Sequence, residues 1–290
     1  MNAAREGAVQ LRFEEPPPLW RAYTRALLSR KPALAASSMP AIEARASAVT
    51  DARALAAYRE VCGCPEDGRL PLAYPHVLAM PLHMAMLTAP AFPVRLPGLV
   101  HVANRIERRR AIAAHERLDF LCTLPGLRET ARGQEFDLHT QARSGGEPVW
   151  SETCTYLARR HGPRDGAARI ALELPAHGEA VQWPAPDGIG RRYARVSGDR
   201  NPIHLHAATA RLFGYTRPIA HGMWSLARVA AQLEARAGGP IAQLACAFKL
   251  PVALPAQLRL YAWEDGGASR YLLTDAAGAR PHLEGGYKLA

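Results

Sequence analysis

The stretch Tyr193–Met223 reads Y-A-R-V-S-G-D-R-N-P-I-H-L-H-A-A-T-A-R-L-F-G-Y-T-R-P-I-A-H-G-M. It carries an acid, Asp199, and an imidazole, His204, five residues apart. We expect Asn201 to order the intervening loop through side-chain hydrogen bonds, and Pro202 to stiffen it by fixing φ. The stretch therefore predicts a polar loop that holds an acid and a base close together.

A second polar signal, His221-Gly222-Met223, stands where another helix is expected to begin. The first N–H groups of a helix have no intrahelical partner, and the helix dipole favours negative charge at that end. An acid, a base and a helix N-terminus together are what the addition of water across an activated double bond requires. We therefore expect most of the function to reside in this stretch.

The overall composition is typical of a globular protein. The chain has 290 residues, of which 48% are hydrophobic, enough for one large domain or two small ones with a sizeable core. No apolar run approaches the length of a membrane span, and the N-terminus lacks the apolar region and cleavage site of a secretory signal. These features predict a cytoplasmic protein.

The five cysteines, odd in number and widely spaced, do not predict a disulfide framework. Cys62-Gly63-Cys64 could supply two ligands of a metal site, but no second Cys or His pair follows at a spacing typical of zinc sites. We expect buried free thiols, and neither a metal nor a redox cofactor.

The net charge is +10 and comes almost wholly from arginine, because the chain has only three lysines. The densest run, Arg105–Arg110, lacks interleaved aromatic residues and any nucleic-acid motif. We expect it to form a solvated face rather than to bind nucleic acid. An excess of positive charge also suits a phosphate-bearing substrate.

A faint internal repeat divides the chain. R-A-L-A-A-Y-R-E-V-C-G (Arg53–Gly63) aligns with I-G-R-R-Y-A-R-V-S-G (Ile189–Gly198), and both predict short amphipathic helices that end at glycine. Further along, Tyr74–Leu87 aligns with Thr216–Val229, and both predict an apolar helix entered through proline. The repeat predicts a duplicated module.

Strand-like segments follow each apolar helix. In the first half they are Leu118–Leu124, Gln134–Ala142 and Val149–Leu157, the last two joined as a hairpin by Gly145-Gly146-Glu147-Pro148. In the second half they are Ala245–Leu250, Gln257–Trp263, Tyr271–Thr274 and His282–Leu289, with turns at Gly266-Gly267 and Gly278. Two units of helix and antiparallel strands predict an α+β fold, joined near Arg159–Asp165.

The two halves differ at the loop. D-R-N-P-I-H follows Gly198, whereas C-P-E-D-G-R follows Gly63 and contains no histidine. The first half also lacks a counterpart of the helix expected at His206–Phe213. We therefore expect a first half without the acid–imidazole pair. Because it is shortened, it is expected to leave an open groove for an apolar tail beside the site.

Three segments, in this order and spacing, resemble the MaoC-like (R)-specific hydratase/dehydratase family: Y-A-R-V-S-G-D-R-N-P-I-H, A-R-L-F-G-Y-T-R-P-I-A-H-G-M and A-F-K-L-P-V, all within residues 193–252. The resemblance implies the hotdog fold, an antiparallel sheet wrapped around a central helix. The whole chain is similar to the double-hotdog members, including the 3-hydroxyacyl-thioester dehydratases of actinobacteria. It implies an N-terminal extension (1–37), a degenerate hotdog (38–160) and a catalytic hotdog (161–290), which form a pseudo-dimer within a monomer or a homodimer.

The resemblance also implies roles for site residues. Asp199 and His204 activate a water, and the backbone N–H of Gly222 stabilises the thioester oxyanion. The substrate is a trans-2-enoyl or (3R)-hydroxyacyl thioester of coenzyme A or acyl carrier protein in fatty-acid metabolism, and no cofactor is needed. The expected substrate-binding residues are Asn201, His221, Met223 and Lys249, of which Lys249 faces the phosphates of the carrier.

Alternatives remain open at this point. Asp199 alone could be a turn or cap residue, His204 alone a structural histidine, and His221 could pack beneath the helix. Some family members carry a serine one to two turns into the central helix, where this chain has Ser225 early and Ala230 later. The alternative activities are those of a hotdog acyl thioesterase and of a non-catalytic acyl-binding protein.

Overall fold

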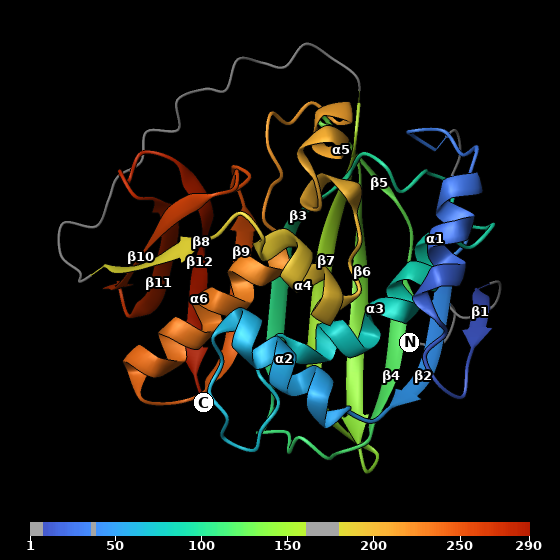
Figure 1. The fold of residues 1–290 in the computed structure, drawn as a ribbon. Coiled ribbons are helices and arrows are strands. Elements are labelled where there is room, and N and C mark those ends of the chain that lie inside the picture. The colour runs from blue at the N-terminus through green and yellow to red at the C-terminus, as the bar shows by residue number, and fades with distance from the viewer. Residues whose placement is uncertain (1–7, 36–38, 161–179) are drawn as a thin grey trace. The chain divides into compact units, whose positions relative to one another are not determined.

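The computed structural model describes residues 8–35, 39–160 and 180–290. Their contacts divide the chain into two compact units: Met1–Asp51 with Tyr74–His161, and Ala52–Ala73 with Gly162–Ala290. Each unit combines a sheet with helices, which confirms the predicted α+β class (Figure 1). Of the expected joint at Arg159–Asp165, the part beyond Arg160 lies outside the described residues.

The sheet of the first unit has the strand order β1-β2-β4-β6-β7-β3, with the short β5 paired to β6. All its pairs are antiparallel except β1 with β2, which is parallel. The strands are β1 (Val9–Arg12), β2 (Ile42–Ala48), β3 (Leu99–Arg108), β4 (Leu118–Leu124), β5 (Arg128–Thr130), β6 (Gly133–Ser144) and β7 (Glu147–Arg159).

The β6–β7 hairpin confirms the turn predicted from sequence. Ser144 pairs with Glu147, so Gly145 and Gly146 form a two-residue loop with φ of 57° and 85°. Positive φ at both central positions is the type I′ geometry, whose twist matches that of the flanking strands. Without a Cβ, glycine adopts this conformation at little steric cost.

Two helices belong to the first unit. Helix α3 (Tyr74–Leu87) has the predicted bounds and packs against β2, β4 and β6, with Leu82 and Met86 fully buried (Figure 1). Helix α1 (Leu19–Leu28) packs against α3. The segment expected as an extension, residues 1–37, thus contributes α1 and the edge strand β1 to this unit.

The sheet of the second unit has the order β9-β12-β11-β10-β8, and all its pairs are antiparallel. Gly266 and Gly267 again form a two-residue turn with positive φ, between β10 and β11. The strands are β8 (Val181–Ala185), β9 (Ile241–Phe248), β10 (Ala256–Asp265), β11 (Ala268–Asp275) and β12 (Pro281–Leu289).

Helix α6 (Gly222–Ala237) is the central helix of the second unit and packs against β9 and β12. Its inner face buries Trp224, Leu226, Val229 and Leu233 almost completely. Burial of each such side chain contributes about 1.5–3 kcal/mol, so this face anchors the helix. The other helices of the unit are α2 (Ala52–Cys62), α4 (Ile189–Ser197), η1 (Pro202–His204) and α5 (Ala207–Leu212).

Helix α2 comes from the first half of the sequence but packs in the second unit, against α4 and α6. Its carbonyl at Val61 accepts a hydrogen bond from Trp224 Nε1 at 3.0 Å, and its Glu60 pairs with Arg192 at 2.7 Å. The domain boundaries expected from sequence assigned this helix to the first hotdog. The helix groups instead with the unit that supplies these hydrogen-bonding and charged partners.

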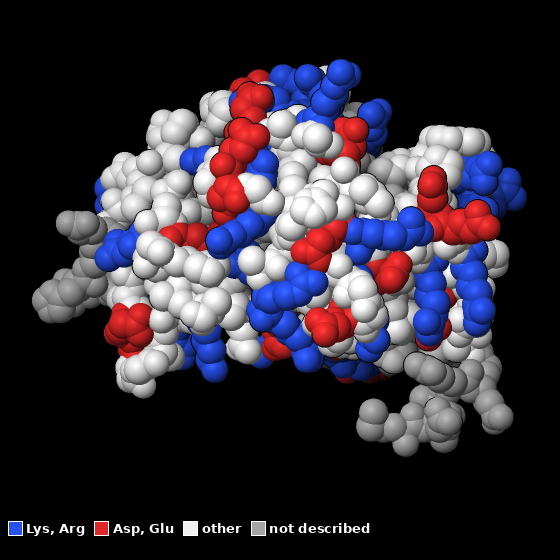
Figure 2. Space-filling model, turned by 90° about the horizontal axis from the view of Figure 1, so that it is seen from below, with Lys and Arg blue, Asp and Glu red and all other residues white. Residues whose placement is uncertain are grey.

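The arginine run is largely exposed, and most of the cysteines are buried. Arg105, Arg109 and Arg110 are exposed as expected, and Arg110 pairs with Glu116 at 2.8 Å, whereas Arg108 is buried. Figure 2 shows basic and acidic side chains interspersed over the face that it draws. All five cysteines are free thiols, and four of them are buried, as predicted.

Candidate active site

The site begins where helix α4 ends. Gly198 adopts the left-handed conformation, with φ of 76°, and its N–H donates to the carbonyl of Ala194 at 3.1 Å. Because only glycine enters this region readily, the chain turns here instead of continuing the helix. The next N–H, that of Asp199, donates to Ser197 Oγ at 3.2 Å. These bonds fix the position at which Asp199 leaves the helix.

The loop after Asp199 is held by local hydrogen bonds. Asp199 Oδ1 accepts from the N–H of Asn201 at 3.0 Å, and Asn201 Oδ1 accepts from the N–H of Ile203 at 3.5 Å. The carbonyl of Asn201 accepts from the N–H of His204 at 3.1 Å. Asn201 therefore orders the loop, as expected. Asp199 is both a turn residue and a carboxylate, and its side chain remains 34% exposed.

Helix α4 and the loop approach each other closely at Gly190. A Cβ built on Gly190 would lie 2.0 Å from the carbonyl oxygen of His204. Only a residue without a side chain permits this distance. The backbone of His204 therefore rests directly on helix α4, and this contact limits how the loop can move.

The imidazole of His204 is buried and has a defined orientation. Its Nδ1 lies 2.8 Å from the carbonyl oxygen of Ile219. Because a carbonyl can only accept, Nδ1 carries the hydrogen, and Nε2 of the neutral ring holds a lone pair. Burial lowers the pKa of His204, against the opposing effects of the Asp199 charge and the Ile219 hydrogen bond. His204 is thus a neutral proton acceptor near pH 7.

The position of Ile219 is itself fixed by backbone pairing. Its N–H donates to the carbonyl of Ile203 at 3.2 Å, and Ile219 forms a β-bridge with Ala253. On either side, Ala220 N–H donates to Val252 and Leu254 N–H donates to Pro218, both at 2.9 Å. The acceptor that orients His204 therefore belongs to a rigid segment.

His221 lies directly against His204. The two rings stack with their centroids 3.7 Å apart. The ring of Tyr193 also packs against His221, with a centroid distance of 4.9 Å. His221 Nε2 donates to the carbonyl of Asp199 at 3.0 Å and lies 3.8 Å from Asp199 Oδ2. Burial and the neighbouring His204 lower the pKa of His221 to about 3, so its ring is neutral. These contacts hold Asp199 and His204 together.

Gly222 opens helix α6 after His221, which is extended at the N-cap and provides no side-chain cap. Within the part of the chain that the structure describes, no acceptor bonds to the N–H of Gly222. A Cβ built on Gly222 would lie 2.8 Å from Phe248 Cε1. Gly222 therefore allows this helix end to approach Phe248 and leaves a donor available at the positive end of the dipole.

Met223 and Lys249 are the remaining residues expected to bind substrate. Met223 is buried in helix α6, and Lys249 Nζ pairs with Glu284 Oε1 at 2.5 Å. Ser225, early in the helix, donates through Oγ to the carbonyl of His221 at 3.4 Å. The geometry thus brings together Asp199, His204 and His221, and places Met223 in the hydrophobic core.

Comparison with known proteins identifies the family of the chain. Residues 187–277 match the model of the MaoC-like domain. The chain is 34% identical to 3-hydroxyacyl-thioester dehydratase X of Mycobacterium tuberculosis over 236 residues, which are 79% of this chain and 82% of that protein. The chain belongs to the MaoC-like dehydratase family. Membership confirms the expected enzyme class, a hydro-lyase.

The solved structures extend the match to the fold. The crystal structure of HtdX of M. tuberculosis has a TM-score of 0.72 and 32% identity, and the match covers 85% of this chain and 100% of that chain. A double-hotdog protein of M. tuberculosis matches with a TM-score of 0.56 at 12% identity, over 83% and 92% of the two chains. The expected hotdog folds are confirmed. Among the described residues, no helix is both long and apolar enough to cross a membrane.

A metal ion was not expected for this MaoC-like chain, yet two residue groups have suitable donor spacing. They are Asp199, His204 and His221 in the second unit, and His76, His83 and Glu152 in the first. In each group one donor atom per residue lies within 4.8 Å of the others. Some of the ring nitrogens in these groups already have a hydrogen-bond partner. His204 bonds to a carbonyl, and His76 Nδ1 bonds to Glu152 at 2.8 Å.

Sequence reasoning missed three supports of the MaoC-like site. The carbonyl of Ile219 orients His204. Ser197 Oγ accepts a hydrogen bond from the N–H of Asp199. The absence of a side chain at Gly190 lets the His204 backbone approach helix α4 closely. A glycine inside a predicted helix was a usable signal for close approach. A backbone carbonyl acceptor carries no signal in the residue type.

Proposed function

We propose that this chain catalyses the reversible addition of water to trans-2-enoyl thioesters, which gives (3R)-hydroxyacyl thioesters. The observation that carries the proposal is the pair of Asp199 and His204, in which a buried imidazole has Nδ1 bonded to a backbone carbonyl beside a carboxylate. A neutral imidazole with a free Nε2 is a general base, and a partly exposed carboxylate orients a water.

The proposed hydration step starts with a water held between Asp199 and Nε2 of His204. His204 takes one proton from this water, and the water oxygen forms a bond to C3 of the enoyl chain. The π electrons move to the thioester oxygen, and the resulting enolate takes a proton at C2 from the same pair. The net change is one water added, and the pair returns to its starting protonation state. Dehydration follows the same path in reverse.

The N–H of Gly222 supports this step as an oxyanion donor. The enolate places negative charge on the thioester oxygen, and a preorganised donor at a helix N-terminus stabilises such charge. Loss of one oxyanion-hole donor typically costs about 10²–10³-fold in rate. The absence of a side chain at Gly222 also lets a thioester approach the backbone.

His221 acts in this scheme as a positioning residue. Its ring is buried against His204, and Nε2–H is bonded to the carbonyl of Asp199. Both contacts help to position the catalytic pair. The Nε2 proton of His221 is already donated to a carbonyl, so we do not assign it to proton transfer. Asn201 has a similar role through the loop hydrogen bonds.

The carrier and the cellular setting are further parts of the proposal. Coenzyme A and acyl carrier protein both present a phosphate-bearing arm, which the net charge of +10 attracts. Lys249 is partly neutralised by Glu284, so its contribution to this attraction is small. A cytoplasmic location and a monomer or homodimer remain predictions of the sequence.

The test is incubation of the purified chain with trans-2-enoyl-CoA esters of increasing length. We expect loss of the enoyl-thioester absorbance, and chiral chromatography should identify the 3R alcohol. The same series on acyl carrier protein distinguishes the carriers. An enzyme inert on both carriers at all chain lengths overturns the proposal.

The two alternative functions give different results in the same assay. A hotdog thioesterase releases a free coenzyme A thiol, which a thiol reagent detects, and it leaves no hydroxyacyl thioester. A non-catalytic acyl-binding protein binds the ester without turnover, and Asp199→Asn leaves that binding unchanged.

A further inference from the structure

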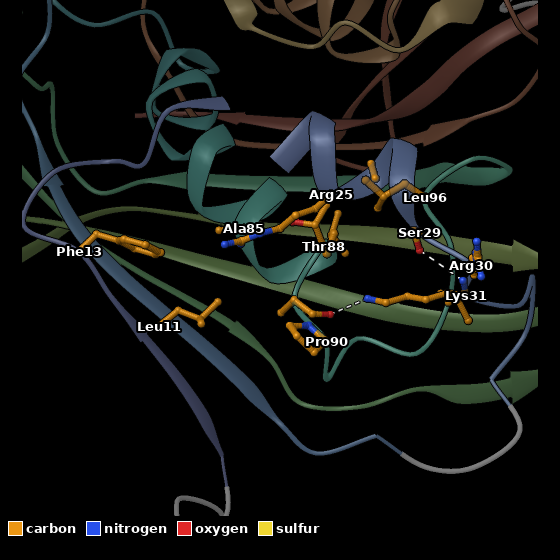
Figure 3. A pocket seen from close by; sticks show the side chains of 14 residues that line it. Leu11, Phe13, Arg25, Ser29, Arg30, Lys31, Ala85, Thr88, Pro90 and Leu96 are labelled. Atoms are coloured by element: carbon orange, nitrogen blue, oxygen red, sulfur yellow. Dashed lines mark hydrogen bonds between the residues drawn. The ribbon is translucent and has the colours of Figure 1, made fainter. Parts of the chain in front are cut away.

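A cavity lies in the first unit, and none of the proposed active-site residues lines it. Its volume is about 510 Å³, within the range of roughly 300–1,000 Å³ typical of small-molecule sites. Strand β1, the end of helix α1 and the segment that follows helix α3 line it (Figure 3). None of its lining residues comes from the unit that holds Asp199 and His204.

Most of the cavity wall is apolar. Leu11 and Phe13 come from β1 and the residue after it, and the opposite wall comes from the end of α3 and the following loop. The apolar side chains of that wall are Ala85, Leu87, Ala89, Pro90, Val94 and Leu96. Such a wall removes a hydrocarbon chain from water, which is favourable by roughly 25 cal/mol per Å² of apolar surface.

The polar part of the wall carries one sign of charge. Arg25, Arg30 and Lys31 line the cavity, and no acidic residue does. The sequence between Pro16 and Ile42 contains no Asp or Glu at all. Within the described residues, neither Arg25 nor Arg30 forms an ion pair or a hydrogen bond through its side chain. Their guanidinium groups are therefore available to an anion.

Lys31 is held at the cavity by its surroundings. Its Nζ donates to the carbonyl of Ala89 at 2.6 Å, as the dashed line in Figure 3 shows, and lies 5.9 Å from the centre of the Phe92 ring. Burial lowers the pKa of Lys31, and no carboxylate offsets this loss of solvation. One carbonyl occupies one of the three ammonium donors, so two remain for a ligand.

We propose that this cavity binds a free fatty acid, with the carboxylate at Arg25, Arg30 and Lys31 and the hydrocarbon chain along the apolar wall. An anionic head and an apolar tail match the two parts of the wall. The lining residues include no Asp or Glu, so they offer no negative charge to a cationic ligand. The site is separate from the proposed catalytic pair and does not depend on its chemistry.

The test is titration calorimetry of the full chain with dodecanoate, compared with the double variant Arg25→Gln/Arg30→Gln. We expect the Kd to rise about tenfold, the effect that two partly exposed charge pairs produce together. The matched control is Arg12→Gln/Arg21→Gln, which removes the same charge from β1 and α1 at residues that do not line the cavity. The control should keep the wild-type Kd.

Two further arms separate the parts of the proposal. Dodecanol, which lacks the charge, should bind at least about tenfold more weakly than dodecanoate. Ala26→Trp, which narrows the cavity from helix α1, should weaken dodecanoate binding while all three basic residues remain. Circular dichroism and the rate on the enoyl thioester check that each variant is folded. Absence of binding to the wild type, equal Kd values for the two double variants, or dodecanol that binds as tightly overturns the proposal.

Discussion

Gly190→Ala tests whether the His204 backbone must rest on helix α4. The added Cβ would lie 2.0 Å from the His204 carbonyl oxygen, and Cβ contacts below 3.0 Å are essentially never observed. The two atoms must therefore separate by about 1 Å. Helix α4 is anchored by the buried Tyr193 and Ala194, so we expect the loop that carries His204 to take up most of this movement.

The displacement predicts a large effect on rate and a moderate effect on stability. A misplacement of about 1 Å at a catalytic group can cost about 10²-fold in rate. Overpacking of this kind costs about 1–3 kcal/mol in the free energy of unfolding. We therefore expect kcat on the enoyl thioester to fall about 10²-fold in a variant that is still folded at 25 °C.

Gly188→Ala is the matched control, because it lies two residues earlier and its added Cβ would meet its nearest neighbour, Arg191, at 3.7 Å. That distance is ordinary van der Waals contact, so the control should keep the wild-type kcat. Steady-state kinetics and thermal melting of both variants provide the measurement. If Gly190→Ala keeps the wild-type kcat, the position of His204 does not depend on its backbone contact with helix α4.

Three further predictions follow from the same geometry. Because burial lowers the pKa of His204 below 6.5 and the neutral ring is the base, kcat/KM should fall with acid only below pH 6.5; an acid limb above 6.5 contradicts this. Burial lowers the pKa of His83 to about 3; for Glu152, burial raises the pKa but His76 outweighs it and lowers the value to about 2. Between pH 6.5 and 3 the unfolded chain therefore binds more protons than the folded chain, and the thermal midpoint of unfolding should drop as the pH falls. A midpoint that stays constant over this range contradicts the prediction. Gly222→Ala keeps the N–H donor, but its Cβ would meet Phe248 Cε1 at 2.8 Å and displace it, so kcat should fall about 10²-fold, and adding Phe248→Leu should restore part of the loss; a wild-type rate in the single variant refutes the need for a glycine at this helix end.

Sequence patterns predicted the elements that carry strong local signals. The bounds of Tyr74–Leu87 and Leu118–Leu124 agree with α3 and β4. Helix α4 ends before Gly198 as expected, because the left-handed position demands glycine. The two-glycine turns likewise specified both long hairpins.

Other elements were missed or left without a partner. Strands β1 and β2 pair in parallel, and both alternate apolar and polar residues (V-Q-L-R and I-E-A-R-A-S-A), a local signal that the prediction overlooked. Strand β3 ends within the arginine run, whose charges concealed the strand pattern, and Arg108 is buried there. Helix α2 was identified, but its partners α4 and α6 lie over a hundred residues later in the chain. Pairing at such distances depends on tertiary packing.

The candidate site shows the same division. Asp199, His204 and Gly222 were identifiable because acid, imidazole and helix start follow one another in a short stretch. The contact that fixes the tautomer of His204 comes from the carbonyl of Ile219, which any residue could supply. The charged cavity under helix α1 was not expected at all, because its walls combine segments from three parts of the sequence.

In the proposed mechanism Asp199 and His204 share one water. A double-mutant cycle on the rate of enoyl-thioester hydration tests it with Asp199→Asn, His204→Gln and the double variant. Each single variant should lose about 10²–10⁴-fold in kcat without loss of the fold, and the double variant should be no slower than the worse single one, because either change disables the pair. Multiplicative losses in the double variant, or a single variant with wild-type kcat, would contradict the account.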